Sequence, residues 1–368
     1  AYDTLSTSGS TISSAITDGS NFAGAASNAM SLTAGKQYTL SLSLTINSGA
    51  TLTYVMFAQD QSGGGSLGLG NYLVNIGTGK HALTFTAPST GTYYLILQAG
   101  NGVTTNFTTG AVSVRLAEED RSVNGKGIQV FGTVTKTAVA TGADLVAYSG
   151  FNASNRLIQP YNSGLDFNSG DFSICFWTNN PSSATEYVLD RADDNGNYRI
   201  AIYMTGANSG TVNLYTVDGS SGVSANLAII GTPNKWAQVW VNRRGAEHEI
   251  WVNGINKVTT LLAARDVASA NGQADLHIGS RFSNANQNTG KLALIRISAT
   301  VPSAEQIKKM YNDEKLLFQP NAKATLYGSS NAVTALAHDD STDLLHAGTS
   351  AGRSVFQGLV RIDNTTDA

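Results

Sequence analysis

The chain has 368 residues, which is enough for two or more packed domains. Charged residues make up only 13% of it and the net charge is −3, so the sequence offers no basic surface for nucleic acid or for an anionic membrane. The hydrophobic share of 41% is sufficient for folded cores. We therefore expect partners that are neutral or recognised by shape, and we expect neither nucleic acid binding nor membrane insertion.

The single cysteine, Cys175, lies in an apolar run, so no disulfide can form within the chain and a buried free thiol is expected. There is no apolar span of 18 residues, and no basic stretch followed by an apolar signal region. The sequence begins Ala-Tyr-Asp without a methionine, which suggests a fragment or a processed chain.

Short antiparallel strands are predicted in the first third of the chain. Residues 1–30 are rich in Ser, Thr, Gly and Ala and show little periodicity. From Tyr38 to Ile46, apolar residues alternate strictly with Ser and Thr, which is the pattern of a strand with one buried and one exposed face. Similar runs follow, separated by turn clusters, at residues 52–57, 82–86, 92–98 and 111–116. We predict an antiparallel sandwich over residues 1–117.

A second all-β domain is predicted over residues 148–318, after a connector at 118–147 that starts with the charge cluster Glu118-Glu119-Asp120-Arg121. Residues 172–177 have the composition of a strand buried on both faces. Asn195-Gly196 lies between the apolar runs 187–191 and 198–203, which is a strong hairpin signal. Another pair of strands is expected at 236–241 and 249–252.

One helix is predicted to begin after Ser303, where Ser303 and Gln306 have the spacing of a capping box. Its apolar face would carry Ile307, Met310 and Tyr311. Beyond Pro320, three short apolar runs predict a small β module over residues 319–368, suited to oligomerisation or docking.

Three segments resemble known families. Residues 31–116, with Thr33–Tyr38 and Thr84–Tyr94, resemble jelly-roll carbohydrate-binding modules. Residues 148–318 resemble a laminin G-like, concanavalin A-like lectin sandwich through the motifs Asp171–Trp177, Lys235–Trp240 and Glu249–Gly254. The connector around Gly127–Thr135 and the last fifty residues, with Gly348–Phe356, are similar to tail proteins of short-tailed bacteriophages.

These resemblances imply an all-β protein of two tandem antiparallel sandwiches, a jelly roll and then a concanavalin A/laminin G-like domain, with one short helix and the C-terminal β module. They also imply a phage tail fibre-like adhesin that binds host-surface polysaccharide without catalysis. Such a protein is located in the virion, is extracellular when it acts, contacts other tail proteins and is commonly a homotrimer. Two alternatives stay open: a purely structural tail component that binds no sugar, and a capsule depolymerase.

Sugar binding needs exposed aromatic rings that stack on sugar C–H groups, and amides that bind the hydroxyls. In the run 92–98, Tyr94 and Gln98 share one face, and Tyr93 lies on the other. Phe57 and Gln59 repeat this mixture of ring and amide, and Tyr72 falls at the rim. The predicted glycan site is therefore Tyr94, Gln98, Phe57, Gln59 and Tyr72; the alternative is that these rings pack in the core. The four tryptophans are expected in the core.

Hard oxygen ligands gather at one predicted hairpin, in Asp190, Asp193, Asp194 and Asn195. The resemblance to laminin G-like domains implies that calcium binds there, whereas turn chemistry explains the same residues without a metal. No other cofactor is required. The acids and histidines at 338–346 lack zinc spacing and are expected in a solvated turn.

No catalytic residue is assigned. Gly348–Gly352 fits the Gly-x-Ser-x-Gly pattern of a hydrolase, but a strand-like run follows it where a helix is needed. Gly63–Gly68 fits a dinucleotide fingerprint, but it too precedes a strand. Glycan cleavage needs two carboxyl groups about 5–10 Å apart, and the sequence establishes no such pair.

Overall fold

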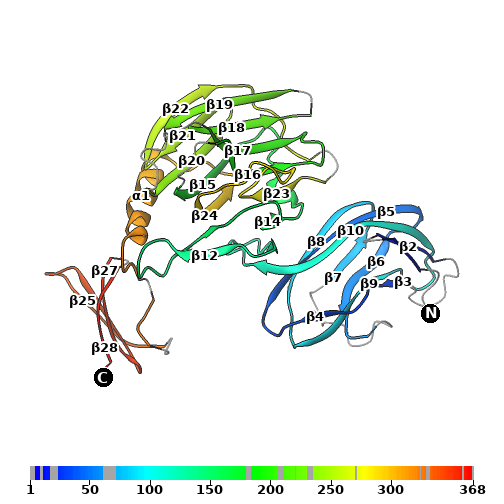
Figure 1. Ribbon diagram of the computed structural model, residues 1–368, viewed down its shortest axis with the longest axis horizontal. Helices are drawn as coiled ribbons and strands as arrows, with labels where there is room; N and C mark the ends of the chain where they lie inside the picture. The colour runs from blue at the N-terminus through cyan, green and yellow to red at the C-terminus, as the bar shows by residue number, and fades with distance from the viewer. Residues whose placement is uncertain are drawn as a thin grey trace.

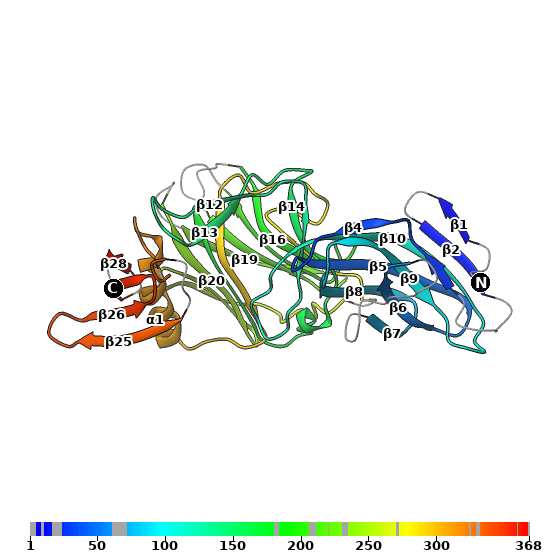
Figure 2. The ribbon, with the colours of Figure 1, turned by 90° about the horizontal axis from the view of Figure 1, so that it is seen from below.

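The computed structural model describes residues 5–8, 11–16, 24–60, 72–179, 184–205, 211–219, 221–229, 235–269, 272–323, 325–328, 332–358 and 360–366. Its elements are almost all antiparallel strands, so the predicted all-β fold with one short helix is confirmed. Two sandwiches lie next to each other, and a small C-terminal sheet lies beyond the second one (Figures 1 and 2). Among the described residues, no helix is both long and apolar enough to cross a membrane.

The first sandwich is built from two sheets that bury the alternating apolar residues between them. One sheet contains β1 (Leu5–Ser8), β2 (Thr11–Ile16), β5 (Gln37–Gly49), β8 (Gly79–Thr86) and β10 (Thr105–Glu118). The other contains β3 (Gly24–Ala26), β4 (Met30–Leu32), β6 (Leu52–Ala58), β7 (Tyr72–Ile76) and β9 (Gly91–Gln98). Leu40, Leu42 and Leu44 of β5 are at most 1% exposed, as their alternation predicts.

In the second sandwich, two larger sheets face each other. One runs in the order β11 (Ile128–Phe131), β14 (Arg156–Gln159), β23 (Asp275–Ile278), β16 (Glu186–Ala192), β17 (Arg199–Thr205), β18 (Thr211–Val217) and β19 (Gly222–Ile229). The other runs β12 (Thr135–Ala138), β13 (Val146–Ser149), β24 (Lys291–Ser298), β15 (Phe172–Asn179), β20 (Ala237–Arg244), β21 (Glu247–Val252) and β22 (Ile255–Leu261). A 3-10 turn, η1, covers Ser163–Leu165. Strand β15 is buried on both faces, and Cys175 within it is a buried free thiol.

The predicted helix, α1 (Ala304–Glu314), packs against the outside of β15, and the 3-10 turn η2 (Lys315–Phe318) follows it. Its capping box is present, with Ser303 Oγ accepting from the Gln306 N–H and Gln306 accepting from the Ser303 N–H. The Trp177 ring stacks on Phe318 with centroids 4.1 Å apart. Trp177 also donates to Glu314 Oε2 at 2.7 Å, so the helix is held by both packing and a charged acceptor.

A C-terminal sheet follows in the simple order β25 (Val333–Asp339), β26 (Leu344–Thr349), β27 (Gly352–Gln357) and β28 (Val360–Thr365). The sequence predicts three of these strands and misses β28, because Arg361, Asp363 and Asn364 give it little hydrophobic signal. The hydrolase-like motif at Gly348–Gly352 spans the end of β26, the two-residue turn and the start of β27. The glycine-rich motif at 63–68 lies outside the described residues.

One continuous backbone ladder joins the two sandwiches. The end of β10 pairs with β11 through Ala117 and Gln129, and β11 in turn pairs with β14 of the second sandwich. The result is a 12-stranded sheet that runs from β1 to β19. Residues 118–147, predicted as a connector, therefore contribute β11, β12 and the first part of β13 to the second sandwich.

Side chains reinforce this junction. Gln129 is 2% exposed, and its amide donates to the Thr39 carbonyl at 2.8 Å, across the two sandwiches. Lys80 of β8 donates to Asp194 at 3.2 Å and to Asp275 at 3.1 Å, both in the second sandwich. These contacts, added to the shared ladder, hold the two sandwiches in one arrangement.

His277 of β23 makes this junction sensitive to acid. Burial, and then the charges of Arg156 and Lys80, lower the pKa of His277 from 6.5 to about 4. As the pH falls, the His277 ring becomes protonated at a higher pH in the unfolded chain than in the folded protein. The free energy of unfolding should therefore decrease between pH 6.5 and 4, by about 3 kcal/mol from this residue. Urea unfolding near pH 7 and near pH 4 measures this decrease in the free energy of unfolding.

The matched variant is His277→Gln, which has no titrating ring. Carboxylates titrate in both proteins, so the difference between their pH profiles isolates His277. We expect the variant to lose less stability on acidification; equal losses in the two proteins would contradict the assignment.

Candidate functional site

Strand β9 has the alternation that the sequence predicts, with Tyr93, Leu95 and Leu97 in the core and Tyr94 and Gln98 on the outer face. Tyr94 is half-buried and Gln98 is 8% exposed. Gln98 therefore has little surface for a ligand. The outer face of the first sandwich is largely closed along β9.

The prediction that Phe57 binds glycan is wrong. It pairs with Leu95, points into the core and is 0% exposed, and its ring centroid lies 4.3 Å from that of Phe85. Gln59 is exposed but follows the last residue of β6, so the two are not a ring-and-amide pair on one strand face. Alternation tells which residues share a face but not which face is the core, and a fully buried ring cannot stack on a sugar.

Tyr72 lies at the rim of the first sandwich, as predicted, and is 40% exposed. Its neighbour is Tyr54, with ring centroids 6.0 Å apart in an edge-to-face arrangement. Tyr54 pairs with Gln98 of β9, so Tyr72, Tyr54 and Gln98 lie on the outer face of this sheet, whereas Phe57 points into the core. The five predicted glycan residues therefore do not form one site.

The predicted calcium residues at the β16–β17 hairpin make other contacts in the structure. Asp190 is fully buried and forms a two-pronged ion pair with Arg199, with N–O distances of 2.7 and 2.6 Å. Asp193 accepts from the Asn195 and Asn197 N–H groups of its own turn, while Asp194 pairs with Lys80. Within the described part of the chain, no group of three or more His, Cys, Asp or Glu side chains is placed to hold a metal ion.

The Asp190–Arg199 pair instead forms the base of an aromatic surface on the outer side of the second sandwich. The guanidinium carbon of Arg199 lies 5.5, 5.7 and 5.1 Å from the ring centroids of Tyr187, Tyr215 and Phe282. Tyr203 stacks on Tyr187 with centroids 5.2 Å apart. We call this surface the ring face, defined as Tyr187, Tyr203, Tyr215 and Phe282.

Glycines give two of these rings their space. A Cβ at Gly222 would lie 2.4 Å from the Tyr215 hydroxyl, and one at Gly196 would lie 2.9 Å from the Phe282 ring. Gly196 also has a φ of +78°, which glycine adopts without strain. The Asn195-Gly196 turn therefore serves both the hairpin and the placement of Phe282.

A β-bulge decides which way Tyr187 points. Asp190 pairs with Ala201 and Leu189 with Ile202, but the register then shifts so that Tyr187 lies opposite Tyr203. In an unshifted register Tyr187 would face Met204, on the core side. The extra residue in β16 turns the Tyr187 ring to the outer face and creates the Tyr187–Tyr203 stack.

The ring face has the parts that sugar binding requires. Tyr203, Tyr215 and Phe282 are half-buried, so they keep accessible ring surface, while Tyr187 is 9% exposed and supports them. Burial and the neighbouring Tyr187 raise the pKa of Tyr203, so its phenol stays neutral at physiological pH and can both donate and accept hydrogen bonds. Rings with hydroxyls on a fixed sheet suit a neutral, hydroxylated ligand.

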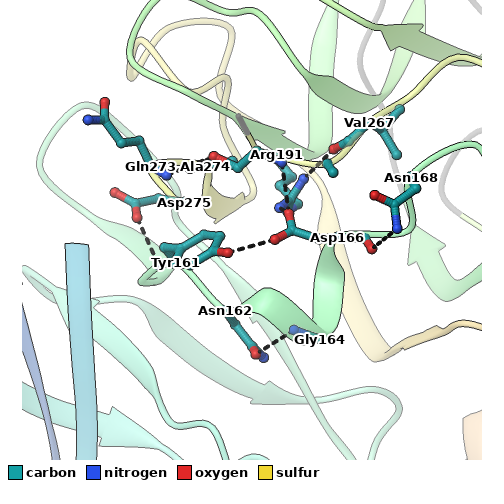
Figure 3. Close-up of polar contacts among 12 residues, drawn as sticks. Tyr161, Asn162, Gly164, Asp166, Asn168, Arg191, Val267, Gln273, Ala274 and Asp275 are labelled. Carbon is teal, nitrogen blue, oxygen red and sulfur yellow. Dashed lines mark hydrogen bonds and ion pairs between the residues drawn. The ribbon is translucent and has the colours of Figure 1, made fainter. Parts of the chain in front are cut away.

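Half-buried carboxylates elsewhere in the second sandwich are used for structure. Figure 3 shows Asp166 between Tyr161, which donates to it at 2.6 Å, and Arg191, with which it forms an ion pair. Asp275 accepts from the Tyr161 N–H at 2.9 Å and also from Lys80. These acids fasten the loops beside the domain junction, and the geometry assigns neither of them to acid or base catalysis.

The sequence contained one signal for the ring face. The Asn195-Gly196 hairpin brings the runs 187–191 and 198–203 together, and each run has a tyrosine, Tyr187 or Tyr203, at the end away from the turn. The bulge in β16 and the return of Phe282 from a distant loop leave no such signal. For that reason the prediction placed the glycan site in the first sandwich.

Residues 152–308 match the family described as the concanavalin A-like lectin/glucanases superfamily. This match covers most of the second sandwich and less than half of the chain. The second sandwich therefore has the concanavalin A-like fold, as the resemblance implies. No curated protein matches the chain in sequence.

Several solved structures are similar at low identity. The receptor-binding domain of a botulinum neurotoxin C/D mosaic is 13% identical with a TM-score of 0.44, covering 65% of this chain and 59% of that one. The binding domain of botulinum neurotoxin DC, in complex with rat synaptotagmin II, is 15% identical with a TM-score of 0.43, covering 68% and 60%. Domain 4 of AbnA, a GH43 arabinanase from Geobacillus stearothermophilus in complex with arabinotriose, is 15% identical with a TM-score of 0.41, covering 52% and 92%.

The chain spans about 60% of the length of the neurotoxin domains that it resembles. The receptor and the sugar named for these structures are ligands of those proteins.

Replacing Asp190 with Asn tests its structural role. The change leaves Arg199 buried without a charged partner, so we expect the free energy of unfolding to fall by about 3–5 kcal/mol. Asp194→Asn is the matched control, because its side chain is 72% exposed and its pair with Lys80 should contribute at most about 1 kcal/mol. Thermal and urea unfolding measure both. A calcium-dependent rise in melting temperature that either variant abolishes would restore the metal site.

Proposed function

We propose that this chain is a glycan-binding adhesin of a bacteriophage tail that acts without catalysis. Its target would be a host-surface polysaccharide, bound at the ring face of the concanavalin A-like sandwich. The proposal differs from the sequence-based prediction in the position of the site and agrees with it in the class of ligand.

One observation carries the proposal: on the outer face of the lectin-like sandwich, two partly accessible rings, Tyr215 and Phe282, lie at the buried Arg199–Asp190 pair, and a third ring stacks beside them on Tyr187. Stacking on C–H groups favours a sugar, whereas a purely apolar ligand would leave the tyrosine hydroxyls without hydrogen bonds. The ion pair is already satisfied, so Arg199 positions the rings and need not be desolvated when a ligand arrives.

A capsule depolymerase is the second candidate, favoured only by the phage resemblance. It requires two carboxyl groups that face one glycosidic bond. Asp166, Asp190 and Asp275 instead accept structural hydrogen bonds or ion pairs. Release of reducing ends from host polysaccharide would support this candidate over the adhesin.

We expect Tyr203→Ala to weaken glycan binding by at least about tenfold, because each stacked ring contributes about 0.5–1.5 kcal/mol beyond its buried area. Tyr203 lies at the surface of the sheet, so the melting temperature should change little. An array of microbial polysaccharides, followed by titration with the best binder, measures the effect.

Tyr72→Ala is the control in the first sandwich, where an equally large ring is exposed. Loss of binding in Tyr72→Ala, with Tyr203→Ala unaffected, would move the site back to the first sandwich. The wild-type chain binding no polysaccharide would support the purely structural tail component.

The phage assignment also includes a place in the virion, contact with other tail proteins and a homotrimeric state, all of which follow from the resemblance of the connector and the C-terminal residues. We expect analytical ultracentrifugation of the purified chain to give a mass about three times 38.5 kDa. A monomer at micromolar concentration would count against the tail-fibre assignment.

A further inference from the structure

Two arginines from different sandwiches stack on one phenylalanine at the domain junction. The guanidinium carbon of Arg115, in β10, lies 4.0 Å from the centroid of the Phe131 ring, in β11. That of Arg156, in β14, lies 4.6 Å from the same ring. We call these three residues the arginine clamp.

Neither guanidinium is neutralised. The ion pairs of the described residues involve other cations, and the side-chain bonds of the clamp go to Ser113 Oγ from Arg115 and to the Ala153 carbonyl from Arg156. Arg156 Nε is buried without a hydrogen-bond partner. Burial and the neighbouring Arg115 lower the pKa of Arg156, and no carboxylate offsets them.

The stacking leaves binding capacity unused. A guanidinium has five N–H donors, and Arg115 is seen to use only its Nε, which leaves its terminal N–H groups available. Arg115 is exposed, and Phe131 and Arg156 are half-buried, so the clamp is open to solvent. A planar guanidinium held over a ring can form two parallel hydrogen bonds with a carboxylate or a sulfate.

The clamp and the ring face share one face of the 12-stranded sheet. Arg156 and Ile158 alternate to the same side of β14, and Ile158 pairs with His277, which pairs with Asp190 beneath the ring face. Strands β14 and β17 are three places apart in the sheet order, which is about 14 Å along the sheet. A glycan of a few sugar units spans this distance.

We infer that the arginine clamp binds an anionic group of the glycan, either a uronic acid carboxylate or a sulfate ester, while neutral sugar units stack on the ring face. This inference rests on the proposed glycan-binding function and adds the ligand class: an acidic polysaccharide. Because the chain carries little net charge, it does not attract polyanions in general, and the two arginines provide the selection of an acidic polymer.

The test is affinity electrophoresis of the full chain through gels that contain alginate as a polyuronate, carrageenan as a sulfated galactan, or dextran as a neutral polymer. We expect Arg115→Gln and Arg156→Gln each to weaken binding to at least one acidic polymer by about tenfold. Arg115→Lys keeps the charge but loses the planar fork, so it should also bind less tightly than wild type. Arg121→Gln, an exposed arginine outside the clamp, is the matched control for loss of one charge.

Retention in alginate but not carrageenan identifies the carboxylate, and the reverse identifies the sulfate; both support the clamp. The inference is overturned if Arg121→Gln loses as much affinity as Arg115→Gln, or if no acidic polymer retards the wild-type chain. A different result would contradict the proposed ring-face site alone. In that case Tyr203→Ala would bind every polymer as tightly as wild type does, while the clamp variants would still lose affinity for the acidic polymers. Thermal unfolding of each variant confirms that it is folded.

Discussion

The backbone ladder from β10 through β11 to β14 is the constraint on which the rest of the molecule depends. Hydrogen bonds of a sheet run perpendicular to its strands, so strands of both sandwiches must keep one register and one common surface. Flexible linkers place no such restriction on neighbouring domains. Because the ladder is continuous, Arg115 of the first sandwich reaches the same ring as Arg156 of the second, and Lys80 reaches Asp194 and Asp275.

Within the second sandwich, the ring face depends on a buried charge pair. Removing Arg199 and Asp190 from water carries a desolvation cost that their attraction only partly offsets, so the pair is a weak contribution to stability by itself. Its geometry has a different effect. Two hydrogen bonds fix the guanidinium plane, and the rings of Tyr187, Tyr215 and Phe282 are arranged around that fixed group. A rigid set of rings loses little entropy when a ligand binds.

Several acids of the second sandwich make structural contacts. Asp166 holds Arg191 and Tyr161, and Glu314 holds Trp177 and the helix against the sheet. The concanavalin A-like fold supports both lectins and glucanases, so the site residues, and not the fold, have to distinguish the two.

The sequence alone determined the features that follow from local chemistry. Alternating residues such as Leu40 and Leu42 specify strands, Asn195-Gly196 specifies a hairpin, and Ser303 with Gln306 specifies the start of the helix, because each depends on neighbours along the chain. Tertiary structure decided the rest. Phe57 is buried because its sheet faces another, Asp190 is engaged by Arg199 across the hairpin, and a bulge turns Tyr187 to the ring face. Those outcomes depend on register and on contacts between distant residues, such as Arg115 with Phe131 and Arg156, which no local pattern encodes.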